Sequence, residues 1–400
     1  MEAWADEFGG TYELSLFGTR RIVIVDPAES RRILTQRPGT FGRGPGPNNV
    51  DSAGRAVGMC PALFTDEDKA WGRSRRLVAP PFSGHNVRTM VPAVVKIATR
   101  LCAKWSAAAE GNGIVDAKDD LGHVAHDVIA LVAFRHEAKA LSATEDDHSV
   151  VFDALENMFD NFVAIISSPF LQFAYKYLPF NGWVRRVERE KAAVRALVKE
   201  LCENERHLIA LEKSPNDDVP LHTNAKAEAS EGMLLRKLVE ASDVGADGGR
   251  VPMPDDEVVT QARSLFLAGQ ETTSKTLAWC MYFLSKHPKV LARCREEAVQ
   301  HISSSDGMVK NFEETTSLTY LTAVMKETLR IKSVVSVLTF WAKSEYTTLD
   351  GSTYPRGTSF AILLRYMSTR EAYFTRAKEF IPERQEQTYT IHHTLSIENN

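Results

Sequence analysis

An acid and two alcohols lie in the middle of a long apolar stretch of this sequence. Residues 266–274 read FLAGQETTS and contain Glu271, Thr272 and Thr273. A helical threonine can donate its hydroxyl to the carbonyl oxygen one turn earlier and so loosen the helix. The segment thus weakens its own helix where it also buries polar groups, and local rules broken together often mark function. It therefore fits either a functional site or a helix kink whose polar groups are satisfied within the protein.

Two small residues, Ala268 and Gly269, lie three and two positions before this acid. Ala268 and Thr272 are four residues apart and would share one face of a helix. A small side chain at position 268 leaves room for a flat group, toward which the Thr272 hydroxyl would point. Gly269 costs about 1 kcal/mol in a helix interior. A costly glycine beside buried polar groups favours a functional origin for the segment.

Glu327 and Arg330 form an ExxR pair, and residues three apart are neighbours on a helix. Near an apolar face, such a pair would need further hydrogen bonds to be tolerated. Arg384, in the segment FIPER, could be the third member. The alternative is an ordinary solvated ion pair.

Trp71 and Arg75 are four residues apart and would face the same way on a helix. An indole N–H and a guanidinium together can bind one anionic group, and arginine suits a carboxylate in bidentate geometry. The alternative is an exposed helix that carries a cation–π pair.

Other kinds of site have weak support. His123 with His126, and His392 with His393, have metal-like spacing but lack a carboxylate partner, so we interpret them as structural residues. The five cysteines are scattered and never form CxxC, which favours a reducing compartment over a zinc or iron–sulfur site. The sequence contains no GxSxG, P-loop or HExxH motif.

A helix over residues 255–286 must position the central segment. Two prolines precede it, three acidic residues occupy its first turn and Pro288 follows it. Residues 277–284 are apolar on every face, which predicts a buried half-helix. Such a long helix implies a domain built around it.

The rest of the chain is mainly helical. We expect helices through most of residues 91–211, loops at 38–61 and 243–254, a hairpin at 11–26 and a buried strand at 360–364. The predicted fold class is mainly α with a minor β-sheet region. Its architecture is one large helical domain around the long central helix.

Composition limits the possible partners. The 400 residues are 44% hydrophobic with a formal net charge of −4, which gives no support for nucleic-acid binding. No apolar run reaches about 18 residues, so no transmembrane helix is expected. The N-terminus lacks a signal-peptide core, which favours the cytoplasmic side.

Taken in order, the motifs resemble those of the cytochrome P-450 haem-thiolate monooxygenases. The resemblance covers nearly the whole chain and predicts a P-450-like catalytic domain at residues 1–384 and an unrelated tail at 385–400. The motifs that carry it are WxxxR at Trp71 and Arg75, AGx(D/E)TT at residues 268–273, ExxR at Glu327 and Arg330, and PER at residues 382–384.

The resemblance implies a role for each motif. Trp71 and Arg75 would hold a haem propionate, and Ala268 and Gly269 would flank the oxygen pocket. Glu271 and Thr272 would relay protons so that the O–O bond of dioxygen breaks heterolytically. The structural triad on the proximal side would consist of Glu327, Arg330 and Arg384.

The sequence departs from the family after Arg384. Members carry a cysteine there, in a glycine-rich loop, as the thiolate ligand of the iron. Here the following residues, QEQTYTIHHTLSIENN, contain no cysteine, so no metal ligand is assigned. We expect the C-terminal part of the domain to be missing, as in a truncated product. An N-terminal anchor, common in members at the endoplasmic reticulum membrane, is also absent.

Two functions follow from the resemblance. The first is haem-dependent insertion of one oxygen atom from O2 into a hydrophobic small-molecule substrate, with electrons from NADPH through a reductase or ferredoxin partner. The alternative is a catalytically inactive, truncated or haem-less relative that acts at most as a hydrophobic-ligand binding protein.

Overall fold

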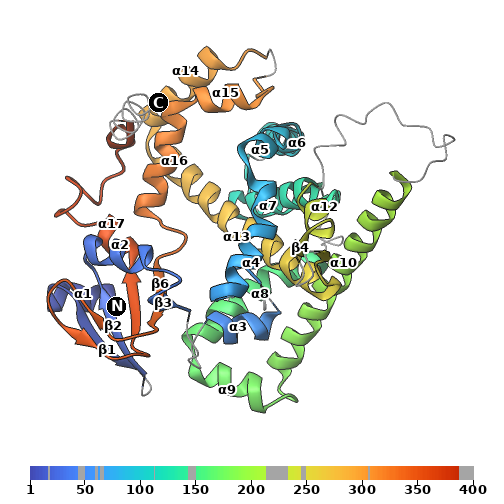
Figure 1. Ribbon diagram of the computed structural model, residues 1–400. Coiled ribbons are helices and arrows are strands. Elements are labelled where there is room, and N and C mark those ends of the chain that lie inside the picture. Colours follow the sequence, from blue (N-terminus) through green and yellow to red (C-terminus); the bar gives the residue numbers. More distant parts are fainter. Residues whose placement is uncertain are drawn as a thin grey trace. The chain divides into compact units, whose positions relative to one another are not determined.

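The computed structural model describes residues 1–16, 19–43, 50–58, 62–63, 67–111, 113–142, 150–212, 233–244, 249–304 and 307–386 (Figure 1). The chain divides into two compact units, which we call the first unit (Met1–Gly44 with Lys275–Asn400) and the second unit (Pro45–Ser274). The fold is mainly helical with a small sheet region, which confirms the predicted fold class.

The first unit contains a five-stranded sheet with the order β1-β2-β9-β6-β3. The hairpin of β1 and β2 is antiparallel, whereas β2 pairs with β9 in parallel, so segments far apart in sequence share one sheet. Ile22, Phe41 and Phe360 fill the core beside it. The strands are β1 (Tyr12–Leu16), β2 (Thr19–Ile24), β3 (Phe41–Gly42), β6 (Val337–Ala342) and β9 (Ser359–Leu363), with β7 (Tyr346–Thr347) and β8 (Thr353–Tyr354) forming a separate small pair.

Short helices complete the first unit, together with the C-terminal half of α13 (Asp255–Lys286). This half of α13 shares a core cluster with α14 and α16, in which the rings of Phe283 and Phe380 stack with centroids 4.5 Å apart. The helices are α1 (Glu2–Phe8), α2 (Pro27–Thr35), α14 (Pro288–His301), α15 (Phe312–Ser317), α16 (Thr319–Ile331) and α17 (Leu364–Ser368).

The predicted burial of residues 277–284 on every face is wrong. Cys280, Phe283 and Leu284 are buried in the cluster with α14 and α16. On other faces of α13, Trp279 is 37% exposed and Tyr282 is 49% exposed. The apolar run is therefore packed on one side only.

The second unit is a helical bundle with one short hairpin. Its core joins buried residues of α7, α8, α10 and α12 with those of the N-terminal half of α13, among them Phe134, Met158 and Phe266. The helices are α3 (Val50–Val57), α4 (Asp68–Val78), α5 (Gly84–Thr89), α6 (Val91–Glu110), α7 (Ala117–Phe134), α8 (Val150–Ser167), α9 (Pro169–Tyr177), α10 (Gly182–Glu212) and α12 (Met233–Val239).

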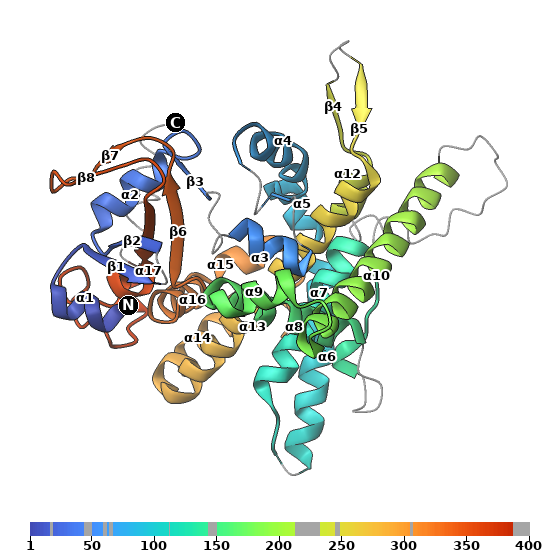
Figure 2. The same ribbon diagram turned by 90° about the horizontal axis from the view of Figure 1, so that it is seen from below.

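Two predicted loops contain regular structure. Residues 38–61 include β3 and helix α3, which places Ala56 and Val57 in the core and packs against α8. The prolines at positions 38, 45 and 47 led to the prediction of a loop for the whole segment, although the residues that follow them contain no proline up to position 60 and include a helix. Residues 243–254 include the hairpin of β4 (Ser242–Val244) and β5 (Arg250–Pro252), which projects beyond α12 (Figure 2).

Candidate active site

Helix α13 positions the central acid–alcohol segment. It spans Asp255–Lys286, as predicted, with three acidic residues in its first turn. The helix is continuous through Gly269 and Thr272. The Thr272 hydroxyl donates to the carbonyl oxygen of Ala268 at 2.8 Å. The backbone bonding expected of a helical threonine is thus present.

The structure gives Gly269 a packing partner. A Cβ atom at this position would lie 2.8 Å from Ile129 Cδ1 and 3.1 Å from Ile129 Cγ1, both closer than normal contact. Ile129 belongs to α7, so the absence of a side chain at position 269 allows α7 to approach α13 closely. Sequence reasoning missed this partner, which lies 140 positions earlier in the chain.

The next residue of the motif fixes the same helix pair by a polar contact. Gln270 Oε1 lies 3.1 Å from His126 Nδ1, and both side chains are buried. Burial lowers the pKa of His126 to about 4, although the bond to Gln270 opposes this shift. His126 is therefore neutral near pH 7 and donates its Nδ1–H to the amide oxygen. This bond gives His126 the structural role that we predicted.

Glu271 is 6% exposed and follows directly in the motif. A second carboxyl group, Glu156 on α8, lies within electrostatic range of it. Burial raises the pKa of Glu156, Lys118 opposes this, and the carboxylates of Glu271 and Asp119 raise it further. The buried acid of the motif thus has a neighbouring carboxyl group whose pKa is raised above that of an ordinary glutamate.

Helix α4 carries Trp71 and Arg75 and forms a hydrogen bond and an ion pair with the N-terminal half of α13. Gln261 Nε2 donates to the Ser74 hydroxyl at 3.1 Å, and Arg73 forms an ion pair with Glu257. Sequence reasoning did not identify either bond, because the residue pairs are more than 180 positions apart. Both fix the α4 backbone and leave the Trp71 and Arg75 side chains outside this contact.

Trp71 and Arg75 have donors available for a ligand. Trp71 is half-buried and Arg75 is exposed. Within the described part of the chain, neither the indole N–H nor the guanidinium forms a hydrogen bond or an ion pair. The two side chains lie one helical turn apart, so they can bind the same anionic group.

The first unit brings Glu327, Arg330 and Arg384 together. Glu327 is completely buried, and its two carboxylate oxygens accept from Arg330 Nε at 2.8 Å and Arg330 Nη2 at 2.7 Å. Arg384 Nε donates to the same carboxylate at 2.9 Å. The backbone N–H of Ile381 and the side-chain amide of Gln385 add two further bonds. Gln385, the first residue beyond the predicted domain boundary, is thus part of this network.

These contacts determine the charge of Glu327. Burial alone would raise its pKa, but the hydrogen bonds from Arg330, Gln385 and the Ile381 N–H outweigh this effect and lower the pKa. Arg330 also donates to the carbonyl oxygens of Ser368 and Ala377, both at 2.7 Å. The ion pair therefore has the additional hydrogen bonds that a buried charge requires.

The described cysteines do not resemble metal ligands. Burial raises the pKa of the Cys202 and Cys294 thiols to about 11 and also raises that of Cys280, so these thiols are protonated near neutral pH. Cys102 is exposed. Among the residues the structure describes, no group of three or more His, Cys, Asp or Glu side chains could hold a metal ion. Cys60 lies outside those residues.

Among the described helices, none combines the length and the apolar character needed to cross a bilayer.

Comparison with known proteins agrees with the resemblance. A sequence model of the cytochrome P450 family matches residues 1–394. Cytochrome P450 monooxygenase claQ of Ampulloclitocybe clavipes is 28% identical over 403 residues, which cover 96% of this chain and 71% of the relative. Cytochrome P450 72A397 of Kalopanax septemlobus is 25% identical over 327 residues, or 80% of this chain and 58% of the relative.

A solved structure shows the same fold. The crystal structure of a cytochrome P450 (CYP102L1) superimposes with a TM-score of 0.76 at 20% identity and covers 96% of this chain and 77% of that chain. With the family match over residues 1–394, these findings show that the chain belongs to the cytochrome P450 family of haem-dependent monooxygenases.

Proposed function

We propose that Glu271 and Thr272 are the proton-handling pair of a P450 monooxygenase site built on α13. Monooxygenation puts one atom of O2 into the substrate and releases the other as water, which consumes two electrons and two protons. A site that excludes water must receive those protons through side chains. The observation that carries the proposal is a buried carboxyl group, Glu271, one residue before a threonine whose hydroxyl donates to Ala268 O at 2.8 Å.

Glu156 supports a route for these protons. Its side chain is exposed, and it lies within electrostatic range of Glu271. Since burial and the nearby carboxylates raise its pKa, Glu156 can take a proton from solvent and pass it to Glu271. Glu271 would then transfer the proton to Thr272, whose hydroxyl would turn from the Ala268 carbonyl toward the reacting oxygen.

The residues fit one part of a haem site. Arg75 and Trp71 offer an available guanidinium and indole N–H for a propionate, and Ala268 is small enough to lie beside a flat ring. When bound, haem would supply the activation of dioxygen. Holding the propionate is the role that we assign to Trp71 and Arg75, and flanking the oxygen pocket is the role of Ala268 and Gly269.

The described residues do not offer a thiolate for the iron. The buried thiols that the structure describes are protonated, and residues 387–400 contain no cysteine. The side chains of α4 and α13 thus support propionate binding and proton delivery, whereas the described cysteines do not support a thiolate ligand. A chain without that ligand would bind hydrophobic ligands without oxidising them, which is the second candidate function.

The further partners follow from the family. We propose a hydrophobic organic substrate and an electron donor that is either an NADPH-dependent reductase or a ferredoxin. Residues 1–384 would form the body of the P450 domain, and of the following segment 385–400 at least Gln385 would belong to it, since Gln385 bonds to Glu327.

Haem titration of the purified chain, followed by reduction under carbon monoxide, separates the two functions. A red-shifted thiolate band indicates the monooxygenase, whereas a histidine-type band or no haem uptake indicates a binding protein. Haem uptake also tests the roles of Trp71 and Arg75 on α4. Arg75→Gln should weaken haem binding about tenfold, because one charge-assisted hydrogen bond to the propionate is lost.

The proton-handling roles are tested by oxygen consumption and product yield with a reductase. Glu271→Gln and Thr272→Ala should each lower the rate by about 100-fold and divert oxygen to peroxide. The matched control is Thr273→Ala, because Thr273 is exposed and adjacent to Thr272. Equal effects at positions 272 and 273 would refute a specific role for Thr272.

A further inference from the structure

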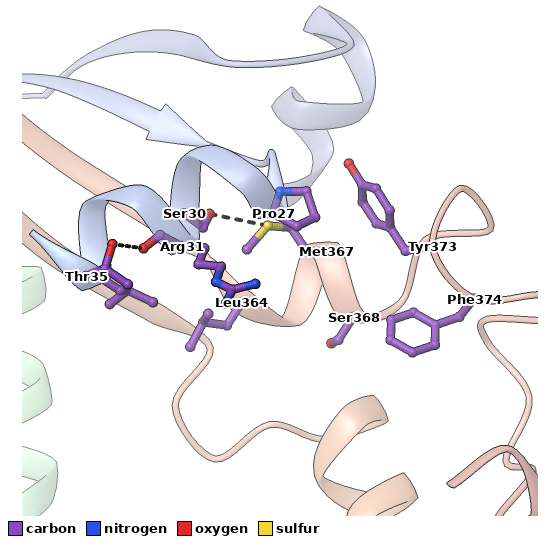
Figure 3. A pocket seen from close by; sticks show the side chains of 10 residues that line it. Pro27, Ser30, Arg31, Thr35, Leu364, Met367, Ser368, Tyr373 and Phe374 are labelled. Carbon is purple, nitrogen blue, oxygen red and sulfur yellow. Dashed lines mark hydrogen bonds between the residues drawn. The ribbon is translucent and has the colours of Figure 1, made fainter. Parts of the chain in front are cut away.

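The first unit contains an open trough that none of the candidate site residues lines. It lies between α2 and the segment that follows β9 and has a volume of about 510 Å³ (Figure 3). Small-molecule sites commonly span about 300–1,000 Å³. The apolar and aromatic side chains that line it are Pro27 and Leu34 from α2 and Leu364, Met367, Tyr373 and Phe374 from the segment after β9.

The serine and threonine hydroxyl groups in the lining are hydrogen-bonded within the protein. Ser30, Thr35 and Ser368 each donate to a backbone carbonyl oxygen, at 2.7, 3.0 and 2.7 Å. The trough therefore presents mainly carbon surface to a ligand. This composition favours an apolar chain over a polar molecule.

Arg31 adds a positive charge to this apolar surface. Its side chain extends from α2 into the space between that helix and the segment carrying Tyr373 and Phe374 (Figure 3). Within the described residues, its guanidinium forms no hydrogen bond, ion pair or ring contact. By contrast, Arg32 donates to the carbonyl oxygen of Thr347 at 2.9 Å, and Arg365 pairs with Glu2 at 2.6 Å.

We propose that this trough binds an amphipathic carboxylate of the fatty-acid class. The carboxylate pairs with the Arg31 guanidinium, which can donate two parallel N–H bonds to it. The hydrocarbon tail of the ligand lies along Leu34, Leu364 and Met367. One cation beside one apolar surface matches one anionic head on one apolar tail.

The far wall of the trough connects this ligand to the Glu327 network. The Arg330 guanidinium carbon lies 5.0 Å from the centre of the Phe374 ring, and Arg330 Nη1 donates to Ser368 O at 2.7 Å. A ligand that packs against Phe374 and Ser368 therefore holds the segment that supplies bonds to Arg330. Binding to the native state alone raises the unfolding midpoint of the chain.

The test is isothermal titration of the full 400-residue chain with dodecanoate, with dodecanol and acetate as ligands that lack the head or the tail. Dodecanoate should bind saturably at one site per chain, and acetate should not bind. Arg31→Gln should weaken dodecanoate binding about tenfold and leave dodecanol binding unchanged. Leu34→Trp, which fills the trough, should remove the binding event at the trough for both long-chain ligands, whereas binding at the substrate site of the second unit should not change.

Arg356→Gln is the matched control, because Arg356 is an exposed arginine of the same unit that does not line the trough. It should bind dodecanoate like the parent chain. A parallel thermal scan should show a higher unfolding midpoint with dodecanoate and no change for Leu34→Trp. The proposal is overturned if dodecanoate does not bind, or if Arg31→Gln and Leu34→Trp bind it as the parent chain does.

Discussion

Glu327 and Glu271 are both buried glutamates on helices, yet their surroundings differ. Glu327 accepts hydrogen bonds from two arginines, an amide side chain and a backbone N–H, and its pKa is lowered. Glu271 lies near another carboxyl group, Glu156. The donors around Glu327 keep its carboxylate ionised, whereas the carboxylate of Glu271 raises the pKa of the neighbouring Glu156.

The largest expected effect is on stability, through the first of these glutamates. Glu327→Gln should lower the free energy of unfolding by about 3–5 kcal/mol, because it leaves the guanidiniums of Arg330 and Arg384 without their carboxylate. Glu271→Gln should change it by less than about 1 kcal/mol, since glutamine keeps the size of the side chain and relieves the repulsion with Glu156. Urea denaturation followed by circular dichroism measures both. Equal losses would erase the contrast between the two sites.

The next effect is the pH dependence that His126 contributes beside the Glu271 segment. Its pKa is about 4 in the folded chain and 6.5 without the fold, so the unfolded state binds more protons between these values. Stability should therefore fall as pH drops from 6.5 to 4, by about 3 kcal/mol.

Denaturant unfolding at several pH values checks this, with His126→Gln as the variant that should flatten the slope in that window. Glu327 does not obscure the result. Its lowered pKa gives stability that is present above pH 4.5 and is lost only as pH falls through the folded value. A slope that persists in His126→Gln would show that another group titrates there.

A smaller effect is expected from packing at the motif. Gly269→Ala should cost about 1–2 kcal/mol of stability, because overpacking against Ile129 exceeds the gain in helix propensity. Ile129→Val in the same chain should recover part of that loss, and a double-mutant cycle of unfolding midpoints measures the coupling. Strictly additive changes would mean that residue 269 does not serve this contact.

The smallest effect concerns the electrostatic link between the two carboxyl groups. Glu271→Gln should move the pKa of Glu156 down toward its ordinary value, since one of the charges that raise it is removed. Carboxyl-carbon NMR titration of Glu156 measures the change, and Asp160→Asn offers a comparison on α8 itself. An unchanged titration in Glu271→Gln would separate Glu156 from the proposed proton route.

Local spacing was enough to predict several parts of this protein. The prolines and acids around residues 252–257 and Pro288 predicted both ends of α13, because helix ends depend on neighbouring residues. The ordered motifs from Trp71 to Arg384 predicted the family. The hairpin of β1 and β2 was also predicted, because alternation of apolar and polar residues is a local signal.

Tertiary structure alone decided what those residues contact. Ile129 against Gly269, His126 on Gln270, and Ser74 on Gln261 join positions more than 100 residues apart, which periodicity cannot identify. The apolar run at 277–284 shows the same limit. Its composition predicted burial all round, but α14 and α16 cover one side only, and which side is covered depends on how distant helices pack.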